Sequence, residues 1–345
     1  MKLFIICTAL WAAALAQPEV DTEYGPVIGQ TITLDDDTEV NSFKGIPFAK
    51  APEGELRFEP PEKAESWGPE PFIADSLGWA CPQSPAGVVW MTHPLWAFYR
   101  EDCLNLNIYT PVDMSAGPYP VMVWFHGGAY LGGANIQYPG HFLAAKDVVV
   151  VVPNYRLGAF GFLATPDGTL KGNAGMLDQV MALQFIHDNI AEFGGDPDLV
   201  TVFGQSAGAG SAAMHMLSPL SEGLVHQAIC ESGADNNIWT TNWPQSNPEE
   251  YVYQTAEKTG CDVGSDAEIV DCMKSLNWTV IRDNQDLTCT PGYFCQGYAP
   301  IVDGPGGFMP DYPDVIRESG EFVHGPLMTG ICRDDGSLYT LAYVP

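Results

Sequence analysis

Short, uninterrupted apolar runs mark the chain from Tyr119-Pro120 onward. Runs of this kind, with no alternation of apolar and polar residues, are typical of strands buried on both faces of a parallel sheet. They lie at Val121–Phe125, Val148–Val152, Leu199–Phe203 and, near the C-terminus, Pro326–Ile331. The first third of the chain is broken by Pro and Gly and predicts only strand fragments, at Thr31–Leu34 and Val40–Phe43.

Helical periodicity separates these runs. Ala174–Phe193 has apolar residues at helical spacing and predicts an amphipathic helix that Gly194-Gly195 ends. A helix of small residues is expected at Ala207–Leu217, directly after the third run. Strands alternating with helices imply right-handed crossovers, so the predicted fold class is α/β, a doubly wound, mostly parallel sheet with helices on both faces. No linker divides the chain, and residues 17–345 are expected to form one domain.

The first sixteen residues have the pattern of a secretory signal peptide. Lys2 precedes an apolar run, Leu3–Leu15, and small residues, Ala14 and Ala16, occupy the −3 and −1 positions of a cleavage site. The alternatives are an N-terminal anchor or a buried helix, but the run is short for a bilayer span. We therefore expect residues 1–16 to be removed and the protein to be secreted. No later segment reaches the length of a membrane span.

Composition and charge narrow the class of partner. The 345 residues are 46% hydrophobic, which is enough for one large core. With 14 Lys and Arg against 43 Asp and Glu, the formal net charge is −29. A surface this acidic repels nucleic acids and anionic lipids, so neither is an expected partner.

Eight cysteines remain once the predicted signal peptide is removed, and an even number in an oxidising compartment favours disulfides. No CxxC pair and no Cys/His cluster with zinc-ligand spacing occurs, so we expect neither a structural metal nor a cofactor. A single Asn-X-Thr sequence, Asn277-Trp278-Thr279, is a candidate N-glycosylation site, provided that it lies in an exposed loop.

The strongest chemical signal is Gly204-Gln205-Ser206-Ala207-Gly208, a G-x-S-x-G sequence. It follows a buried strand and opens a small-residue helix, the setting that a nucleophile elbow requires. Ser206 is then the predicted nucleophile, and the Ala207 amide, at the helix N-terminus, is a predicted oxyanion donor. The alternative is that Ser206 only caps the helix.

A second glycine sequence, His126-Gly127-Gly128-Ala129, directly follows the first apolar run. Glycines here would let the Gly127 and Gly128 amides approach a substrate carbonyl and complete an oxyanion hole. The alternative is an ordinary glycine turn after a strand. In folds with a nucleophile elbow, the catalytic residues follow one another along the chain as serine, acid and histidine. Because His126 precedes the serine, we assign it to the loop and not to the catalytic base.

Six segments in a fixed order make the chain similar to the type B carboxylesterases, the cholinesterase-like family of α/β-hydrolases. The resemblance runs from about Gly25 to the end of the chain. Its segments are Ser42–Pro61 (SFKGIPFAKAPEGELRFEPP), Glu101–Pro111 (EDCLNLNIYTP), Pro120–Gly133 (PVMVWFHGGAYLGG), Asn154–Leu163 (NYRLGAFGFL), Gly172–Leu183 (GNAGMLDQVMAL) and Phe193–Ser211 (FGGDPDLVTVFGQSAGAGS).

The resemblance also implies an acid and two disulfides. The acid lies in a segment similar to Thr329–Tyr339, where Asp335 occupies the position that is usually Glu; Asp334 is the alternative, and either could be only a turn residue. The implied disulfides pair Cys81 with Cys103 and Cys261 with Cys272. Proximity alone suggests a bond between Cys289 and Cys295, while Cys230 and Cys332, in apolar segments, are expected to be buried thiols.

Two features depart from the family pattern. Gln205 stands where esterases of choline usually carry Glu, which weakens a cholinesterase interpretation. The family's catalytic histidine comes far downstream of the acid, and all seven histidines here, the last being His324, precede Asp335. The resemblance thus implies that the α/β-hydrolase fold is C-terminally incomplete in these 345 residues and lacks its base.

The favoured function is a serine carboxylic ester hydrolase that forms an acyl-enzyme from a small-molecule ester. The principal alternative is a non-catalytic, secreted or cell-surface binding protein on the same fold. A cholinesterase-type enzyme and a lipase of another α/β-hydrolase branch fit the sequence less well.

Overall fold

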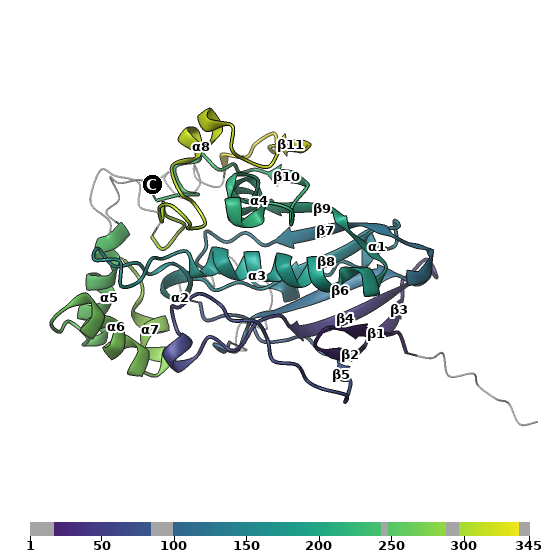
Figure 1. The fold of residues 1–345 in the computed structure, drawn as a ribbon, viewed down its shortest axis with the longest axis horizontal. Coiled ribbons are helices and arrows are strands. Elements are labelled where there is room, and N and C mark those ends of the chain that lie inside the picture. The colour runs from purple at the N-terminus through teal and green to yellow at the C-terminus, as the bar shows by residue number, and fades with distance from the viewer. Residues whose placement is uncertain (1–16, 84–98, 243–247, 288–296, 338–345) are drawn as a thin grey trace, which may run out of the picture.

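The computed structural model describes residues 17–83, 99–242, 248–287 and 297–337. Within them the main sheet has the strand order β11-β10-β9-β7-β8-β6-β4-β3 (Figure 1). Its strands are β3 (Gln30–Thr33), β4 (Glu39–Pro47), β6 (Asn105–Pro111), β7 (Tyr119–Phe125), β8 (Val149–Pro153), β9 (Gly195–Gln205), β10 (Gln227–Glu231) and β11 (Leu327–Gly330). The predicted signal peptide, His93 and the Cys289–Cys295 pair lie outside the described residues.

The strands from β11 to β8 run parallel to one another, whereas β6, β4 and β3 extend the sheet in antiparallel pairs. The predicted doubly wound, mostly parallel sheet is therefore confirmed, with an antiparallel end formed by the first third of the chain. A second, small sheet of β1 (Glu19–Thr22), β2 (Gly25–Ile28) and β5 (Phe72–Ile73) lies beside it.

Strand β6 was not predicted because polar residues interrupt its apolar pattern, although every residue in it is buried. Most of the polar groups on these side chains are paired inside the protein. Asn107 Oδ1 accepts from Gly45 N at 2.9 Å, and Asn105 Nδ2 donates to the Trp79 and Cys103 carbonyls, whereas Asn107 Nδ2 is buried without a partner. Hydrogen bonds lower the cost of burying an amide, so a hydropathy pattern does not reveal such a strand.

Helices cover both faces of the sheet. Side chains of α3 (Ala174–Asn189) and α4 (Ala207–Leu217) pack with the alternate residues Val121, Val123 and Phe125 of β7 in the main core. On the opposite face, α1 (His141–Ala144) packs through Ala144 in a smaller cluster with Val150 and Val152 of β8. The remaining helices are α2 (Gly158–Phe162), α5 (Tyr251–Thr259), α6 (Asp266–Ser275), α7 (Trp278–Asn284) and α8 (Pro313–Ser319).

Helix α3 begins where predicted but differs from the prediction in its end and its buried face. It finishes at Asn189, and a 3-10 turn, Ile190–Phe193, leads to the left-handed Gly194. Three of the apolar residues that defined the predicted stripe, Leu177, Val180 and Met181, are only half-buried. The polar residues Asp178, Gln179 and Asn189 are buried instead, because each has a partner inside the protein.

The structure forms both disulfides that the family resemblance implied, Cys81–Cys103 and Cys261–Cys272. Cys230, on β10, is a buried thiol as expected, and burial raises its pKa to about 11. The expectation for Cys332 was wrong, because this thiol is exposed. It follows an edge strand that no further described strand covers.

Strand β11 confirms the predicted run at Pro326–Ile331 and occupies the edge of the parallel part of the sheet. Its side chains are open to solvent: Leu327, Met328 and the following Ile331 are 58%, 65% and 80% exposed. Within the described ranges, no helix combines the length and the apolar character needed to span a bilayer.

Candidate active site

Ser206 lies on a sharp turn between β9 and α4. Its backbone has φ 58° and ψ −122°, a region that non-glycine residues occupy only when the surrounding structure imposes it. The Ser206 N–H donates to the Glu231 carbonyl of β10 at 2.9 Å, which ties the turn to the neighbouring strand. Ser206 is half-buried, whereas the adjoining Gln205 is exposed.

The two glycines of the elbow are required by the close approach of β7. A Cβ at Gly208 would lie 1.9 Å from the Phe125 carbonyl oxygen, and one at Gly204 would lie 2.5 Å from the same atom. Both contacts are with backbone and cannot be relieved by rotating a side chain. The G-x-S-x-G sequence therefore reflects packing between the elbow and β7.

The loop after β7 brings backbone donors to Ser206. A Cβ built on Gly127 would lie 3.3 Å from Ser206 Cβ, so this residue borders the serine directly. The N–H groups of Gly127, Gly128 and Ala207 have no acceptor among the described residues. Gly127 and Ala207 are buried, and buried N–H groups without an acceptor are rare. The three candidate oxyanion donors thus combine proximity to Ser206 with the capacity to bind one more acceptor.

Buried side chains hold this loop from behind. His126 Nδ1 lies 2.9 Å from the Gly127 carbonyl, and the ring stacks on Tyr155, whose hydroxyl donates to the His126 carbonyl at 2.6 Å. Gln83 makes two bonds to Gly133, accepting from its N–H at 3.0 Å and donating to its carbonyl at 2.6 Å. Tyr130 donates to the Ala207 carbonyl and links the loop to α4. The donors therefore have fixed positions.

Asp335 reaches the site from the end of β11. Its Oδ1 accepts a hydrogen bond from Ser232 Oγ at 2.9 Å, and the Ser232 N–H donates to the Gly330 carbonyl at 2.7 Å. The alternative acid, Asp334, has a side chain that forms no hydrogen bond with a described residue. Ser206, Ser232 and Asp335 follow the carboxyl ends of three neighbouring parallel strands, the edge at which such sheets usually bind ligands.

These residues line one open pocket of about 810 Å³. Its walls include Gln205, Ser206, Ser232, Trp239, Cys332 and Asp335. Gly233 allows the close approach, since a Cβ there would lie 2.5 Å from the Ser206 carbonyl oxygen. Ser232 and Trp239 were not predicted from the sequence, because β10 was not predicted. The Glu231-Ser232-Gly233 sequence at the end of that strand is the signal that could have indicated them.

None of the described histidines lines this pocket. His126 and His215 are buried, and burial lowers their pKa values to about 4 and about 3. His187 and His324 are exposed, and His141 and His226 are partly buried elsewhere. The described part of the chain therefore offers no imidazole to take the Ser206 proton.

His215, which is part of α4, belongs instead to a buried polar network. Its Nε2 lies 2.9 Å from Gln179 Oε1, and its Nδ1 lies 2.7 Å from Ser221 Oγ. Because Gln179 Nε2 donates to Ser211 Oγ, the Gln179 oxygen is left to accept from Nε2–H, and Nδ1 then accepts from Ser221. The network connects α3 to α4 and holds a neutral ring.

A metal centre has no basis in the described residues, which contain no group of three or more His, Cys, Asp or Glu side chains placed to hold an ion. The functional groups near Ser206 are hydroxyls, carboxylates and backbone amides. The arrangement can position a serine, a carboxylate and oxyanion donors around one carbonyl group.

Comparison with known proteins gives the same picture. Residues 16–345 match the model of the carboxylesterase family. The chain is 36% identical to neuroligin-2 of Mus musculus over 355 aligned residues. The aligned region covers 92% of this chain and 41% of that protein. The chain is 38% identical to juvenile hormone esterase of Tribolium castaneum (94% and 56%) and 37% identical to carboxylesterase 1C of Rattus norvegicus (94% and 59%), each over 344 residues.

The chain spans about half the length of the curated relatives it matches. The family match covers the elbow, the loop after β7 and the segment that carries Asp335. The fold, the strand–turn–helix around Ser206 and these matches lead to one conclusion: the chain belongs to the carboxylesterase family.

Proposed function

We propose that this chain provides the nucleophile, the oxyanion hole and the acid of a serine hydrolase acting on small-molecule carboxylic esters. The observation that carries the proposal is the strained Ser206 turn beside three N–H groups that have no acceptor among the described residues. Such a turn costs free energy, and ester hydrolysis uses its geometry. Membership of the carboxylesterase family supports the reaction class.

In the proposed reaction Ser206 Oγ attacks the ester carbonyl carbon and loses its proton to a base. The carbonyl oxygen becomes negatively charged and accepts hydrogen bonds from Gly127, Gly128 and Ala207, which stabilise the tetrahedral intermediate. The alcohol then leaves with a proton, and water hydrolyses the acyl-serine. Asp335, held by Ser232, would accept a hydrogen bond from the imidazolium and stabilise it.

The base must be a histidine other than those that the structure describes, since none of these lines the pocket. Removing a triad member typically lowers kcat by a factor of about 10⁴ or more. We therefore predict little turnover by the 345-residue chain. Full activity is predicted for an in-frame product that contains residues 1–345 and supplies a downstream histidine.

A non-catalytic binding protein on the same fold is the second candidate. The observation that favours it is the same lack of an imidazole at Ser206 among the described residues. The chain's matches include proteins named neuroligins as well as proteins named esterases. The intact elbow and oxyanion loop favour the enzyme.

Hydrolysis of p-nitrophenyl acetate separates the two candidates when the 345-residue chain is compared with the longest in-frame product. If the protein is an enzyme, we expect the longer product to hydrolyse the ester and Ser206→Ala to abolish this hydrolysis. If the reading frame stops after Pro345, or if the longer product hydrolyses no short-chain ester, the binding-protein alternative is favoured. Robust turnover by the 345-residue chain would instead reveal a base among its own seven histidines.

We also propose that the protein is secreted after cleavage behind Ala16. The signal-like sequence of residues 1–16 supports this. The two disulfides support it independently, because structural disulfides persist mainly in oxidising compartments. N-terminal sequencing of protein recovered from the culture medium tests it, and a mature chain beginning at Gln17 is the expected result.

A further inference from the structure

The candidate glycosylation sequence Asn277-Trp278-Thr279 lies at the junction of α6 and α7, where Asn277 is the N-cap of α7. Asn277 is exposed, as are Ser275 before it and Val280 after it. Asn277 is therefore exposed as the prediction required, but the sequence caps a helix and does not lie in a loop, since Trp278 and Thr279 begin α7 and are half-buried.

The two ends of the Asn277 amide have different surroundings. Its Oδ1 accepts hydrogen bonds from the Thr279 N–H at 3.0 Å and from Thr279 Oγ1 at 2.8 Å, and so caps the first turn of α7. Its Nδ2 donates to no described residue. The nitrogen to which an oligosaccharide would be joined thus belongs to an exposed side chain and has no hydrogen-bond acceptor among the described residues, while the oxygen is occupied.

We propose that Asn277 carries an N-linked oligosaccharide on Nδ2 and that the folded protein keeps its helix cap in the glycosylated form. The donor is a polyprenyl-diphosphate-linked oligosaccharide. The bond between sugar C1 and the diphosphate oxygen breaks, a bond between C1 and Nδ2 forms, one proton leaves Nδ2 and the polyprenyl diphosphate departs. The product is still an amide, so Oδ1 remains an acceptor for both Thr279 groups.

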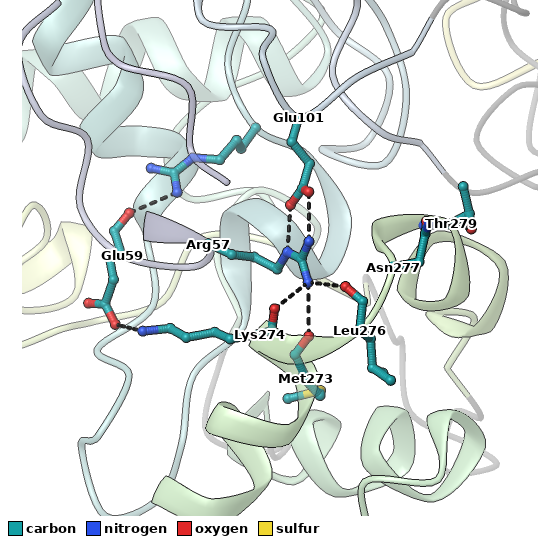
Figure 2. A network of polar contacts seen from close by, with 9 residues as sticks. Arg57, Glu59, Glu101, Met273, Lys274, Leu276, Asn277 and Thr279 are labelled. Atoms are coloured by element: carbon teal, nitrogen blue, oxygen red, sulfur yellow. Dashed lines mark hydrogen bonds and ion pairs between the residues drawn. The ribbon is translucent and has the colours of Figure 1, made fainter. Parts of the chain in front are cut away.

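The chain before Asn277 is fixed from inside the protein. Arg57 Nη1 donates to the Leu276 carbonyl at 2.7 Å and to the Met273 carbonyl at 2.9 Å, and the same guanidinium forms two bonds to Glu101, at 2.5 and 2.7 Å. Figure 2 shows Arg57 at the centre of these contacts, with Asn277 and Thr279 on the far side of Leu276. Arg57 and Glu101 are buried. An oligosaccharide on Asn277 would therefore extend from a fixed position into solvent without displacing core residues.

A neighbouring disulfide supplies an independent argument. Cys261–Cys272 ends five residues before Asn277, and such bonds form in the same oxidising lumen in which N-glycans are attached. The proposal rests on the proposed secretion, because a chain that stays in the cytosol meets no donor.

Deglycosylation of the full chain, expressed with its own first sixteen residues in insect or mammalian cells, tests the proposal. The sequence contains one Asn-X-Ser/Thr site, so any change in gel mobility after peptide-N-glycosidase treatment reports on Asn277. We expect a shift for the wild type and conversion of Asn277 to Asp in the tryptic peptide 275–282. The mobility shift can be measured without enzymatic activity, and it does not depend on the stability of the folded protein.

Matched variants make the result specific. Asn277→Asp keeps a capping oxygen but removes the acceptor nitrogen, and Thr279→Ala removes the hydroxyl that the acceptor sequence requires; both should lose the shift completely. Thr279→Ser retains the sequence and should keep the shift. A secreted, signal-cleaved wild type with no shift, or a shift that persists in Asn277→Asp, would overturn the site while leaving secretion intact. Retention of an uncleaved chain in the cytosol would overturn both proposals.

Discussion

Ser206 and Asp335 line the same pocket, but the protein holds them in different ways. The Ser206 turn is packed between β7, β9 and α4, and Gly204 and Gly208 leave no room for a Cβ beside the Phe125 carbonyl. Asp335 is exposed, follows the edge strand β11, and has one side-chain hydrogen bond among the described residues, from Ser232. Backbone packing therefore positions Ser206, the proposed nucleophile, whereas one polar contact positions Asp335, the proposed acid.

This difference means that the two parts of the site should respond differently to mutation. Changes near Ser206 act on close-packed backbone and should cost folding stability. Changes near Asp335 meet open space and should alter the site's chemistry with little effect on stability.

The largest effect is expected from Gly208→Ala. The added Cβ would lie 1.9 Å from the Phe125 carbonyl oxygen, so β7 or α4 must shift. Overpacking of a rigid site costs up to about 3 kcal/mol, and we expect the free energy of unfolding to fall by about that amount. Urea titration followed by circular dichroism measures it. A change below about 0.5 kcal/mol, the size typical of surface substitutions, would show that the elbow is not held by packing.

We expect an effect of intermediate size on the pH dependence of the free energy of unfolding, through His215. Its native pKa of about 3 lies below the ordinary 6.5, so the unfolded chain binds the proton more strongly than the folded protein does. The stabilisation from the neutral ring is fully present above pH 6.5 and is lost as the pH falls toward 3, by about 1.4 kcal/mol per pH unit. Compared with wild type, His215→Gln should lose less stability between pH 6 and pH 4.

Urea titrations at several pH values give this comparison, with His187→Gln as the control at an exposed histidine. Equal pH dependence of wild type and His215→Gln would contradict the neutral, buried assignment of the ring beneath the elbow.

A smaller effect on folding, but a measurable one on chemistry, is expected from Ser232→Ala. It removes the donor to Asp335 Oδ1. Because Asp335 is exposed, stability should change by less than about 0.5 kcal/mol. A lost hydrogen bond to a carboxylate corresponds to about a tenfold loss in rate, measurable as kcat/KM for p-nitrophenyl acetate in an active in-frame product. An unchanged rate would show that the hydroxyl does not position the acid.

The smallest effect is expected from Gly330→Ala in β11. A Cβ there meets no atom within 4 Å, so stability should stay within about 0.5 kcal/mol of wild type. Urea titration alongside Gly208→Ala gives the direct contrast between the two regions. A large loss at Gly330 would mean that the edge strand is as tightly packed as the elbow.

Much of this contrast could be predicted from the sequence, because the parallel strands beside Ser206 are uninterrupted apolar runs. Strands β7 and β9 were indicated by the apolar runs Val121–Phe125 and Leu199–Phe203. The glycine-containing segments that follow these runs indicated the loop and the elbow. What the sequence did not reveal depends on buried polar pairing. Strand β6 buries asparagines that hydrogen-bond inside the protein through Asn105 Nδ2 and Asn107 Oδ1. Helix α3 buries Asp178 against Arg156, where a hydrophobic pattern predicts a surface residue.

The acid side of the site was predictable only by resemblance. Asp335 sits in an exposed, polar turn with no distinctive periodicity. Its partner Ser232 directly follows a strand, β10, that the apolar pattern did not indicate. The contact joins residues 103 positions apart, and a single sequence contains no signal for such a pairing.

Labelling with a fluorophosphonate, followed by peptide mass mapping, tests the central claim about Ser206 most directly. It should be applied to the longest in-frame product that contains residues 1–345, with Ser206→Ala as the control. We predict one adduct, on the peptide that contains Ser206, and none in the variant. The absence of an adduct at Ser206 in a product that supplies a downstream histidine, or an adduct that persists in Ser206→Ala, would contradict it.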